Sequence, residues 1–111
     1  MKILHKPTCI TCKKAIAEIE RMKLDIEKRD FFKDPLSGVE LKKIIKISEK
    51  TPYELLRKRD KMFKELDLAN SKKTDSQIIK LMVKYPGLIM RPIVISGNKA
   101  FVGKFDSKNL K

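Results

Sequence analysis

Residues 2–14 of the chain read KILHKPTCITCKK, and this stretch contains the strand, the turn and the helix start that decide the fold. The apolar run at residues 2–5 predicts a short strand, and Lys6-Pro7-Thr8 after it predicts a turn. Thr8 is expected to cap a helix that begins near Ile10, because its hydroxyl can accept a hydrogen bond from a free backbone N–H.

This helix is predicted to extend over residues 10–22, since apolar side chains recur there every three or four positions. They are Ala15, Ile16, Ile19 and Met22. Residues 24–30 then alternate apolar and polar side chains, which predicts a second strand. The three elements form a βαβ unit, in which the strands are expected to be parallel and the crossover right-handed.

Helical patterns dominate the middle of the chain. Ser37 followed three residues later by Glu40 predicts a capping box at the start of one helix. Pro52 stands where the first turn of a helix tolerates proline, so a second helix is predicted over residues 53–58.

The last part of the chain returns to strands. A helix capped by Thr74 or Asp75 is predicted first. The apolar segments 93–95 and 100–102 flank a turn and predict a β-hairpin. A short helix is expected at residues 106–110.

The predicted element order is β-α-β, then helices, then β-β-α. This is the order of a thioredoxin-like domain, an α/β fold with a mixed four-stranded sheet flanked by helices and an all-helical insertion between strands 2 and 3. At 111 residues, one domain is expected. Its sheet core would comprise residues 1–33 and 88–111, with the helical insertion at residues 34–87.

The net charge of +13 comes from 27 Lys and Arg against 14 Asp and Glu, yet it does not favour a nucleic-acid partner. Only five cations are arginines, the lysines are spread along the chain, and aromatic residues are scarce at 6%. A solvated basic surface is the simplest interpretation, and attraction of an anionic substrate or an acidic protein is the alternative. No apolar run is long enough for a membrane span, and a cytoplasmic location is expected.

The two cysteines of the chain, Cys9 and Cys12, are separated by two residues at the predicted strand–helix junction. Free N–H groups at a helix start, together with Lys13 and Lys14, favour a thiolate at Cys9, which is therefore the predicted nucleophile. Cys12 lies one turn further, where its thiol can attack an adduct of Cys9 and resolve it. A C-x-x-C motif beside a βαβ pattern is typical of thioredoxin-like redox proteins.

Other interpretations of the two cysteines remain open. A zinc site within the chain would have His5 as a third soft ligand and would be three-coordinate at best. A structural disulfide is disfavoured in the cytoplasm, and two inert thiols are also possible. The phenylalanines at 31, 32, 63 and 101 are expected to pack in the core.

Pro92 stands where thioredoxin-like domains hold a cis proline against the active-site thiols, so a cis Arg91–Pro92 bond is predicted. Over nearly its whole length the chain resembles the arsenate reductase (ArsC) and Spx family of thioredoxin-like proteins. The matching segments are HKPTC at 5–9, LLRK at 55–58, LDL at 66–68, YPGL at 85–88 and RPIVI at 91–95.

The resemblance implies roles for individual residues. In glutaredoxin-coupled arsenate reductases, the cysteine that matches Cys9 attacks arsenate, and the arginines that match Arg57 and Arg91 hold the oxyanion. His5 matches a histidine that favours the thiolate. Such a site is chemically coherent, since cations that bind a tetrahedral oxyanion also stabilise a neighbouring thiolate.

Two positions depart from the reductase pattern. Lys104 stands where those enzymes carry a third anion-holding arginine, and Cys12 stands where they usually have serine. The dithiol is typical of Spx, and Arg59 matches an arginine near the Spx redox centre. We assign substrate binding to His5, Arg59, Lys104 and Pro92. Catalysis is assigned to Cys9, Cys12, Arg57 and Arg91.

Two functions are therefore expected. The first is a thiol-dependent oxidoreductase in which Cys9 attacks an arsenate-like oxyanion or a disulfide and Cys12 resolves the product. It would need no bound cofactor or metal and would receive electrons from thioredoxin, glutaredoxin or glutathione. The alternative is an Spx-like redox-sensing regulator that binds the RNA polymerase α subunit. A purely structural or interaction module is the third hypothesis.

Overall fold

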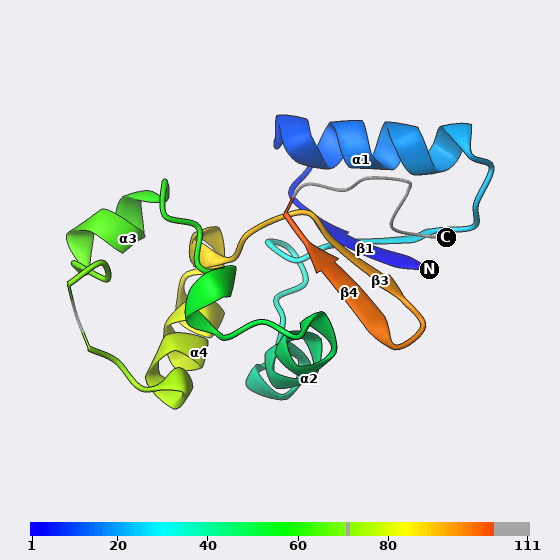
Figure 1. The fold of residues 1–111 in the computed structure, drawn as a ribbon. Coiled ribbons are helices and arrows are strands. Elements are labelled where there is room, and N and C mark those ends of the chain that lie inside the picture. The colour runs from blue at the N-terminus through cyan, green and yellow to red at the C-terminus, as the bar shows by residue number, and fades with distance from the viewer. Residues whose placement is uncertain (71, 104–111) are drawn as a thin grey trace. The chain divides into compact units, whose positions relative to one another are not determined.

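The computed structural model describes residues 1–70 and 72–103. The predicted helix at 106–110 and the candidate residue Lys104 lie outside the described residues. The chain divides into two compact units, one formed by Met1–Asp34 together with the chain from Arg91 onward, the other by Pro35–Met90 (Figure 1). That the two form a single domain stays a prediction.

The first unit contains the predicted mixed sheet. Its strands are β1 (Lys2–His5), β2 (Glu27–Asp30), β3 (Ile93–Ser96) and β4 (Lys99–Val102), in the spatial order β2-β1-β3-β4. The first strand pairs parallel with β2 and antiparallel with β3, and β3 and β4 form the predicted hairpin. Parallel strands end at the same edge, so His5 at the end of β1 faces Asp30 at the end of β2.

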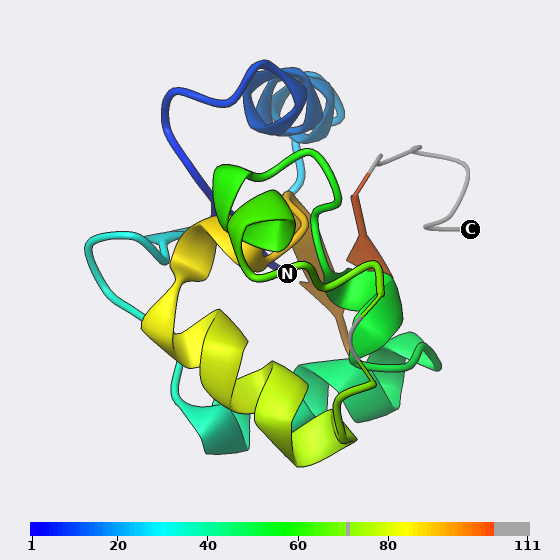
Figure 2. The ribbon, with the colours of Figure 1, turned by 90° about the vertical axis from the view of Figure 1, so that its left-hand side faces the viewer.

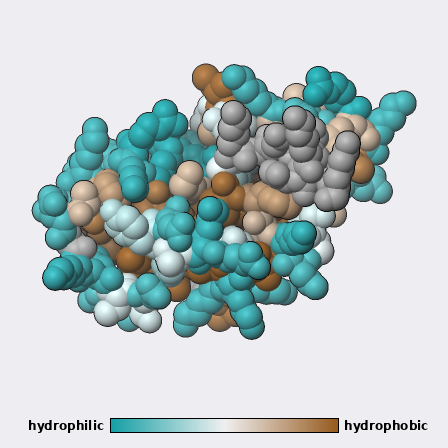
Figure 3. Space-filling view, in the orientation of Figure 1, coloured by the Kyte–Doolittle hydropathy of each residue, from teal (hydrophilic) through white to brown (hydrophobic). Residues whose placement is uncertain are grey.

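Helix α1 (Ile10–Arg21) connects the parallel strands and covers one face of the sheet (Figure 1). Ala15 and Ile19 of this helix are buried against Ile3 and Val94 of the sheet, as the apolar periodicity predicts. The opposite side of the helix is solvated. Apolar surface is visible over the start of α1 (Figure 3), where Ile10 is 70% exposed.

Two boundaries in this unit differ from the predictions. The N-cap of α1 is Cys9, not Thr8, because Cys9 keeps extended backbone angles and Ile10 is the first helical residue. The second strand begins at Glu27 instead of residue 24. Lys23 adopts a left-handed conformation and the N–H of Leu24 bonds to the C=O of Ile19, so these residues end the helix.

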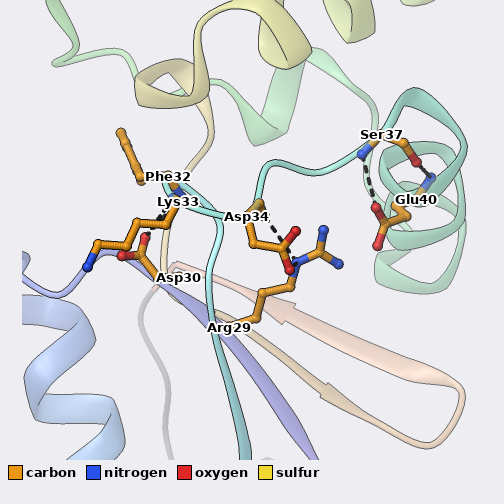
Figure 4. A network of polar contacts seen from close by, with 7 residues as sticks. All are labelled: Arg29, Asp30, Phe32, Lys33, Asp34, Ser37 and Glu40. Atoms are coloured by element: carbon orange, nitrogen blue, oxygen red, sulfur yellow. Dashed lines mark hydrogen bonds and ion pairs between the residues drawn. The ribbon is translucent and has the colours of Figure 1, made fainter.

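The second unit contains helices between β2 and β3. They are α2 (Gly38–Ser48), the 3₁₀ turn η1 (Tyr53–Leu55), α3 (Lys61–Glu65), α4 (Asp75–Lys84) and the 3₁₀ turn η2 (Pro86–Leu88). Ser37 and Glu40 form the predicted capping box of α2 (Figure 4), and Thr74 caps α4. Figure 2 shows α4 beside α2, against which it packs.

The predicted helix over residues 53–58 is wrong beyond its first turn. Leu56 is extended and pairs with Ile89 in an antiparallel bridge. The N–H of Arg57 donates to the C=O of Leu88 at 2.7 Å, and the N–H of Met90 donates to the C=O of Leu55 at 2.9 Å. Pairing between residues 33 positions apart therefore replaces the helical hydrogen bonds that local sequence favours.

Candidate redox site

Cys9 and Cys12 lie at the start of α1, just after β1. The N–H of Cys9 donates to the C=O of Lys6 at 3.0 Å, which closes the turn between strand and helix. The C=O of Cys9 accepts the N–H of Lys13 at 3.0 Å, which is the first helical bond. Both cysteines are free thiols, and Cys9 is partly exposed whereas Cys12 is completely buried. Only the first sulfur is therefore accessible to a substrate.

The surroundings of Cys9 favour its ionised form. Burial by itself raises the pKa of this thiol, but hydrogen bonds from the N–H and thiol of Cys12, the N–H of Thr11 and the Arg91 side chain outweigh it. The net effect lowers the pKa of Cys9 below its ordinary value. The N–H groups of Thr11 and Cys12 belong to the first turn of α1, where the positive end of the helix dipole also favours an anion.

Cys12 has the opposite behaviour. Burial raises the pKa of its thiol to about 11, and the adjacent Cys9 sulfur adds to the rise. The backbone N–H of Lys6 donates to Cys12 Sγ at 3.5 Å, which opposes this effect in part. Near neutral pH the site thus pairs a thiolate-prone sulfur with a protonated one. The roles of Cys9 as nucleophile and Cys12 as resolving thiol stay predictions.

Arg91 is the buried cation of this site, with 9% of its surface exposed. The Arg91–Pro92 bond is cis, as predicted. The C=O of Pro92 accepts the N–H of Gly103 at 2.8 Å, which ties this position to the residue after β4. Since Arg91 donates to the Cys9 sulfur, the structure brings together Cys9, Cys12 and Arg91 of the predicted catalytic set.

His5 occupies the end of β1. Burial lowers the pKa of its imidazole, while Asp30 on the neighbouring strand opposes the shift. Its Nδ1 is buried and has no hydrogen-bond partner within residues 1–70 and 72–103. A neutral imidazole near pH 7 follows from this environment. The implied role of His5 toward the thiolate stays a prediction.

Arg57 and Arg59 belong to the second unit. Arg57 follows η1 in the segment paired with Leu88, and its guanidinium lies 3.8 Å from the carboxylate of Asp60. Arg59 is exposed in the turn before α3. Arg57 does not stand on a helix as the pattern of residues 53–58 predicted, and the roles of both arginines in the site stay predictions.

Two residues near the dithiol, Phe32 and Lys6, were not selected as site residues from the sequence. The Phe32 ring, which the sequence pattern assigns to core packing, lies 5.3 Å from the guanidinium carbon of Arg91 and 4.9 Å from the Lys6 ammonium. No local pattern could indicate these contacts, because they join three segments far apart in sequence.

In the part of the chain that the structure describes, there is no cluster of three potential metal ligands.

A sequence model of the ArsC family matches residues 4–111. The chain belongs to the ArsC family. Spx 1 of Oceanobacillus iheyensis, a global transcriptional regulator, is 33% identical over 97 residues that span 87% of this chain and 74% of that protein. The Spx regulator of Bacillus subtilis is 32% identical over 97 residues, which again span 87% of this chain and 74% of that protein. The resemblance inferred from the sequence is confirmed.

Solved structures of ArsC-family proteins have the same fold. A putative arsenate reductase from Yersinia pestis superimposes with a TM-score of 0.85 at 27% identity, covering 92% of this chain and 90% of its own. An ArsC family related protein from Bacteroides fragilis has a TM-score of 0.88 at 25% identity, with 97% and 93% coverage. They confirm the thioredoxin-like α/β fold. No described helix has the length and apolarity needed to span a membrane.

The two thiols of this ArsC-family protein should differ sharply in their alkylation. Because its pKa is lowered, Cys9 should react with iodoacetamide at lower pH than glutathione does, and its rate should level off once it is ionised. Cys12 should stay unmodified until the pH approaches about 11. Peptide mass spectrometry of the reduced chain across pH 5–10 measures both. Equal rates at the two cysteines would contradict the assignment.

Proposed function

We propose that this ArsC-family protein is a thiol-dependent oxidoreductase in which Cys9 attacks an oxyanion such as arsenate, or a disulfide, and Cys12 resolves the adduct. The observation that carries the proposal is the pairing of an accessible, thiolate-favouring Cys9 with a buried, protonated Cys12 beside Arg91. A dithiol with such opposite pKa shifts is suited to donate two electrons in two successive steps.

With arsenate, the proposed chemistry balances within the dithiol. The Cys9 thiolate forms a bond to arsenic(V), and one oxygen leaves as water after protonation. Cys12 then loses its proton and attacks the Cys9 sulfur. The sulfur–arsenic bond breaks, its electron pair stays on arsenic, and arsenite departs. The Cys9–Cys12 disulfide holds the oxidised state, and a thioredoxin, a glutaredoxin or glutathione restores the two thiols.

The charged residues of the site support binding of an anion in this proposal. Arg91 already donates to the Cys9 sulfur, so its guanidinium would contact a substrate attacked there and offset the charge of the transition state. Arg57, Arg59 and Lys104 are proposed to contribute further positive charge. His5 and Pro92 would line the substrate side of the dithiol.

Replacing Cys12 by serine should trap the intermediate. A serine hydroxyl cannot resolve the adduct, so a mixed disulfide between Cys9 and an oxidised small thiol should accumulate in C12S. The wild type should instead end as an internal disulfide. Intact mass spectrometry after exposure to oxidised glutathione separates the two states. Accumulation of the same adduct in the wild type would show that Cys12 does not resolve it.

A second function is favoured by the similar sequences. The Spx relatives at 32–33% identity are named as global transcriptional regulators, and the chain spans 74% of their length. We therefore also propose a redox-sensing regulator that binds the RNA polymerase α subunit and changes this contact when the dithiol is oxidised. The same Cys9–Cys12 chemistry serves both functions, since a sensor thiol must also be ionised and accessible.

One pair of assays distinguishes the two functions. Arsenate-dependent oxidation of a reduced thioredoxin or glutaredoxin relay would support the enzyme. Capture of the RNA polymerase α subunit, together with no arsenate turnover, would support the regulator. Absence of both would overturn both proposals. The thioredoxin or glutaredoxin relay and the RNA polymerase α subunit are cytoplasmic proteins, so a cytoplasmic location of this chain belongs to the proposal as well.

A further inference from the structure

The Phe32 ring contacts two cations that flank the dithiol. Arg91 Cζ lies 5.3 Å from the ring centroid and Lys6 Nζ lies 4.9 Å from it. Both distances are within the range of an attractive interaction between a cation and an aromatic ring. Arg91 is buried, where such an interaction is stronger than at an exposed surface. All three residues belong to the unit that carries the cysteines.

The turn after β2 holds Phe32 in place. The carboxylate of Asp30 accepts the N–H of Phe32 at 3.0 Å and that of Lys33 at 3.4 Å (Figure 4). The Phe32 ring also packs against the fully buried Phe31 ring, with centroids 4.9 Å apart. A second link across the turn joins Arg29 to Asp34 at 3.1 Å. The ring is therefore fixed by its own segment and not only by the cations.

The two residues that carry these cations also contact the cysteines. The backbone of Lys6 accepts the N–H of Cys9 and donates to the sulfur of Cys12. Arg91 donates to the sulfur of Cys9. Two like charges near one another repel, and the electron-rich face of an aromatic ring offsets part of this repulsion. Without the ring, the long Arg91 side chain would lose a contact that restricts its conformation.

We propose that Phe32 is a positioning residue, whose ring holds the guanidinium of Arg91 beside the Cys9 sulfur. Phe32, in the turn after β2, thereby acts on Cys9 at the start of α1 through Arg91, which precedes β3. This inference deepens the proposed function and rests on it, because it takes Cys9 to be the nucleophile. Phe32 itself has no group that can take part in the reaction.

The pH profile of Cys9 alkylation in the full chain tests this role. In Phe32→Leu the rate at pH 7 should fall about three- to tenfold, and the profile should move to higher pH. At high pH, where Cys9 is ionised in both proteins, the rates should converge. Phe32→Tyr keeps the aromatic face and should stay within about twofold of the wild type. Phe32→Met gives a second non-aromatic variant if the leucine variant does not fold.

Two controls separate positioning from a general structural effect. Phe101→Leu makes the same change at a partly buried ring packed on the core of the same unit, and should keep the wild-type profile. In an Arg91→Gln background, Phe32→Leu should add nothing, because the cation through which the ring acts is gone. Circular dichroism establishes that each variant folds.

Three outcomes decide the matter. An unchanged profile in the folded Phe32→Leu or Phe32→Met protein would overturn the positioning role. A full effect of Phe32→Leu in the Arg91→Gln background would also overturn it, since the ring would then act without Arg91. If wild-type Cys9 alkylates like glutathione, the proposed function fails first. The failure of the proposed function is thus distinguishable from failure of the positioning role alone.

Discussion

Replacing Cys9 by serine is expected to abolish thiol-dependent turnover, with a loss of at least about a thousandfold. A serine hydroxyl is not ionised near neutral pH, and hydrogen bonds that favour a thiolate cannot change this. The fold should tolerate the change, because Cys9 is partly exposed and serine is an accepted N-cap residue. Unfolding in urea should shift by no more than about 0.5–1 kcal/mol.

The informative comparison for Cys9→Ser is Cys12→Ser, which keeps the nucleophile and removes the resolving thiol. That variant should form one adduct per chain and then stop, whereas Cys9→Ser should form none. The assay follows oxidation of the thioredoxin or glutaredoxin relay, with adduct mass as a second measurement. Turnover by a folded Cys9→Ser protein would exclude Cys9 as the catalytic nucleophile.

Ile19→Ala should produce the largest loss of stability among simple changes in α1. Ile19 is fully buried between the helix and the sheet, against Ile3 and Val94. Removing its outer carbons deletes apolar contacts and leaves a cavity, which costs about 2–5 kcal/mol of the free energy of unfolding. Urea denaturation monitored by circular dichroism measures the effect as a lower midpoint.

Helix α1 offers its own matched control for this change. Ile10→Ala alters the same residue type in the same helix, but Ile10 is 70% exposed. Its unfolding free energy should change by less than about 0.5 kcal/mol. Similar losses for the two variants would mean that α1 does not pack through Ile19, and the packing described for this unit would be wrong.

The elements whose signals are local could be predicted from the sequence. The period of Ala15 and Ile19 indicates a helix face, and Ser37 with Glu40 indicates a helix start, because these patterns act within one or two turns. Residues 53–58 also have a helical pattern, yet Leu56 pairs with Ile89. A local pattern contains no information about a partner 33 residues away, so this prediction failed.

The candidate site shows the same division. Two cysteines in a C-x-x-C motif after a strand indicate a redox pair. The pKa of Cys9 is lowered and that of Cys12 is raised, while their roles as nucleophile and resolving thiol stay predictions. The resemblance to the ArsC and Spx family supplied the role of Arg91, and the predicted thioredoxin-like fold supplied the cis bond before Pro92. Phe32 was assigned to packing, since an aromatic residue between polar ones gives no sign of the cations that it meets.

The order of residues alone thus determined that β1, α1 and the β3–β4 hairpin form and that two cysteines stand at the start of α1. Those properties depend on neighbours along the chain, through hydrogen bonds and side-chain periods of a few residues. The tertiary structure decided which sulfur is accessible and which is buried, and which cation and ring stand beside the nucleophile. Burial and charge act through space, so they arise only when β1, the turn after β2 and the start of β3 come together.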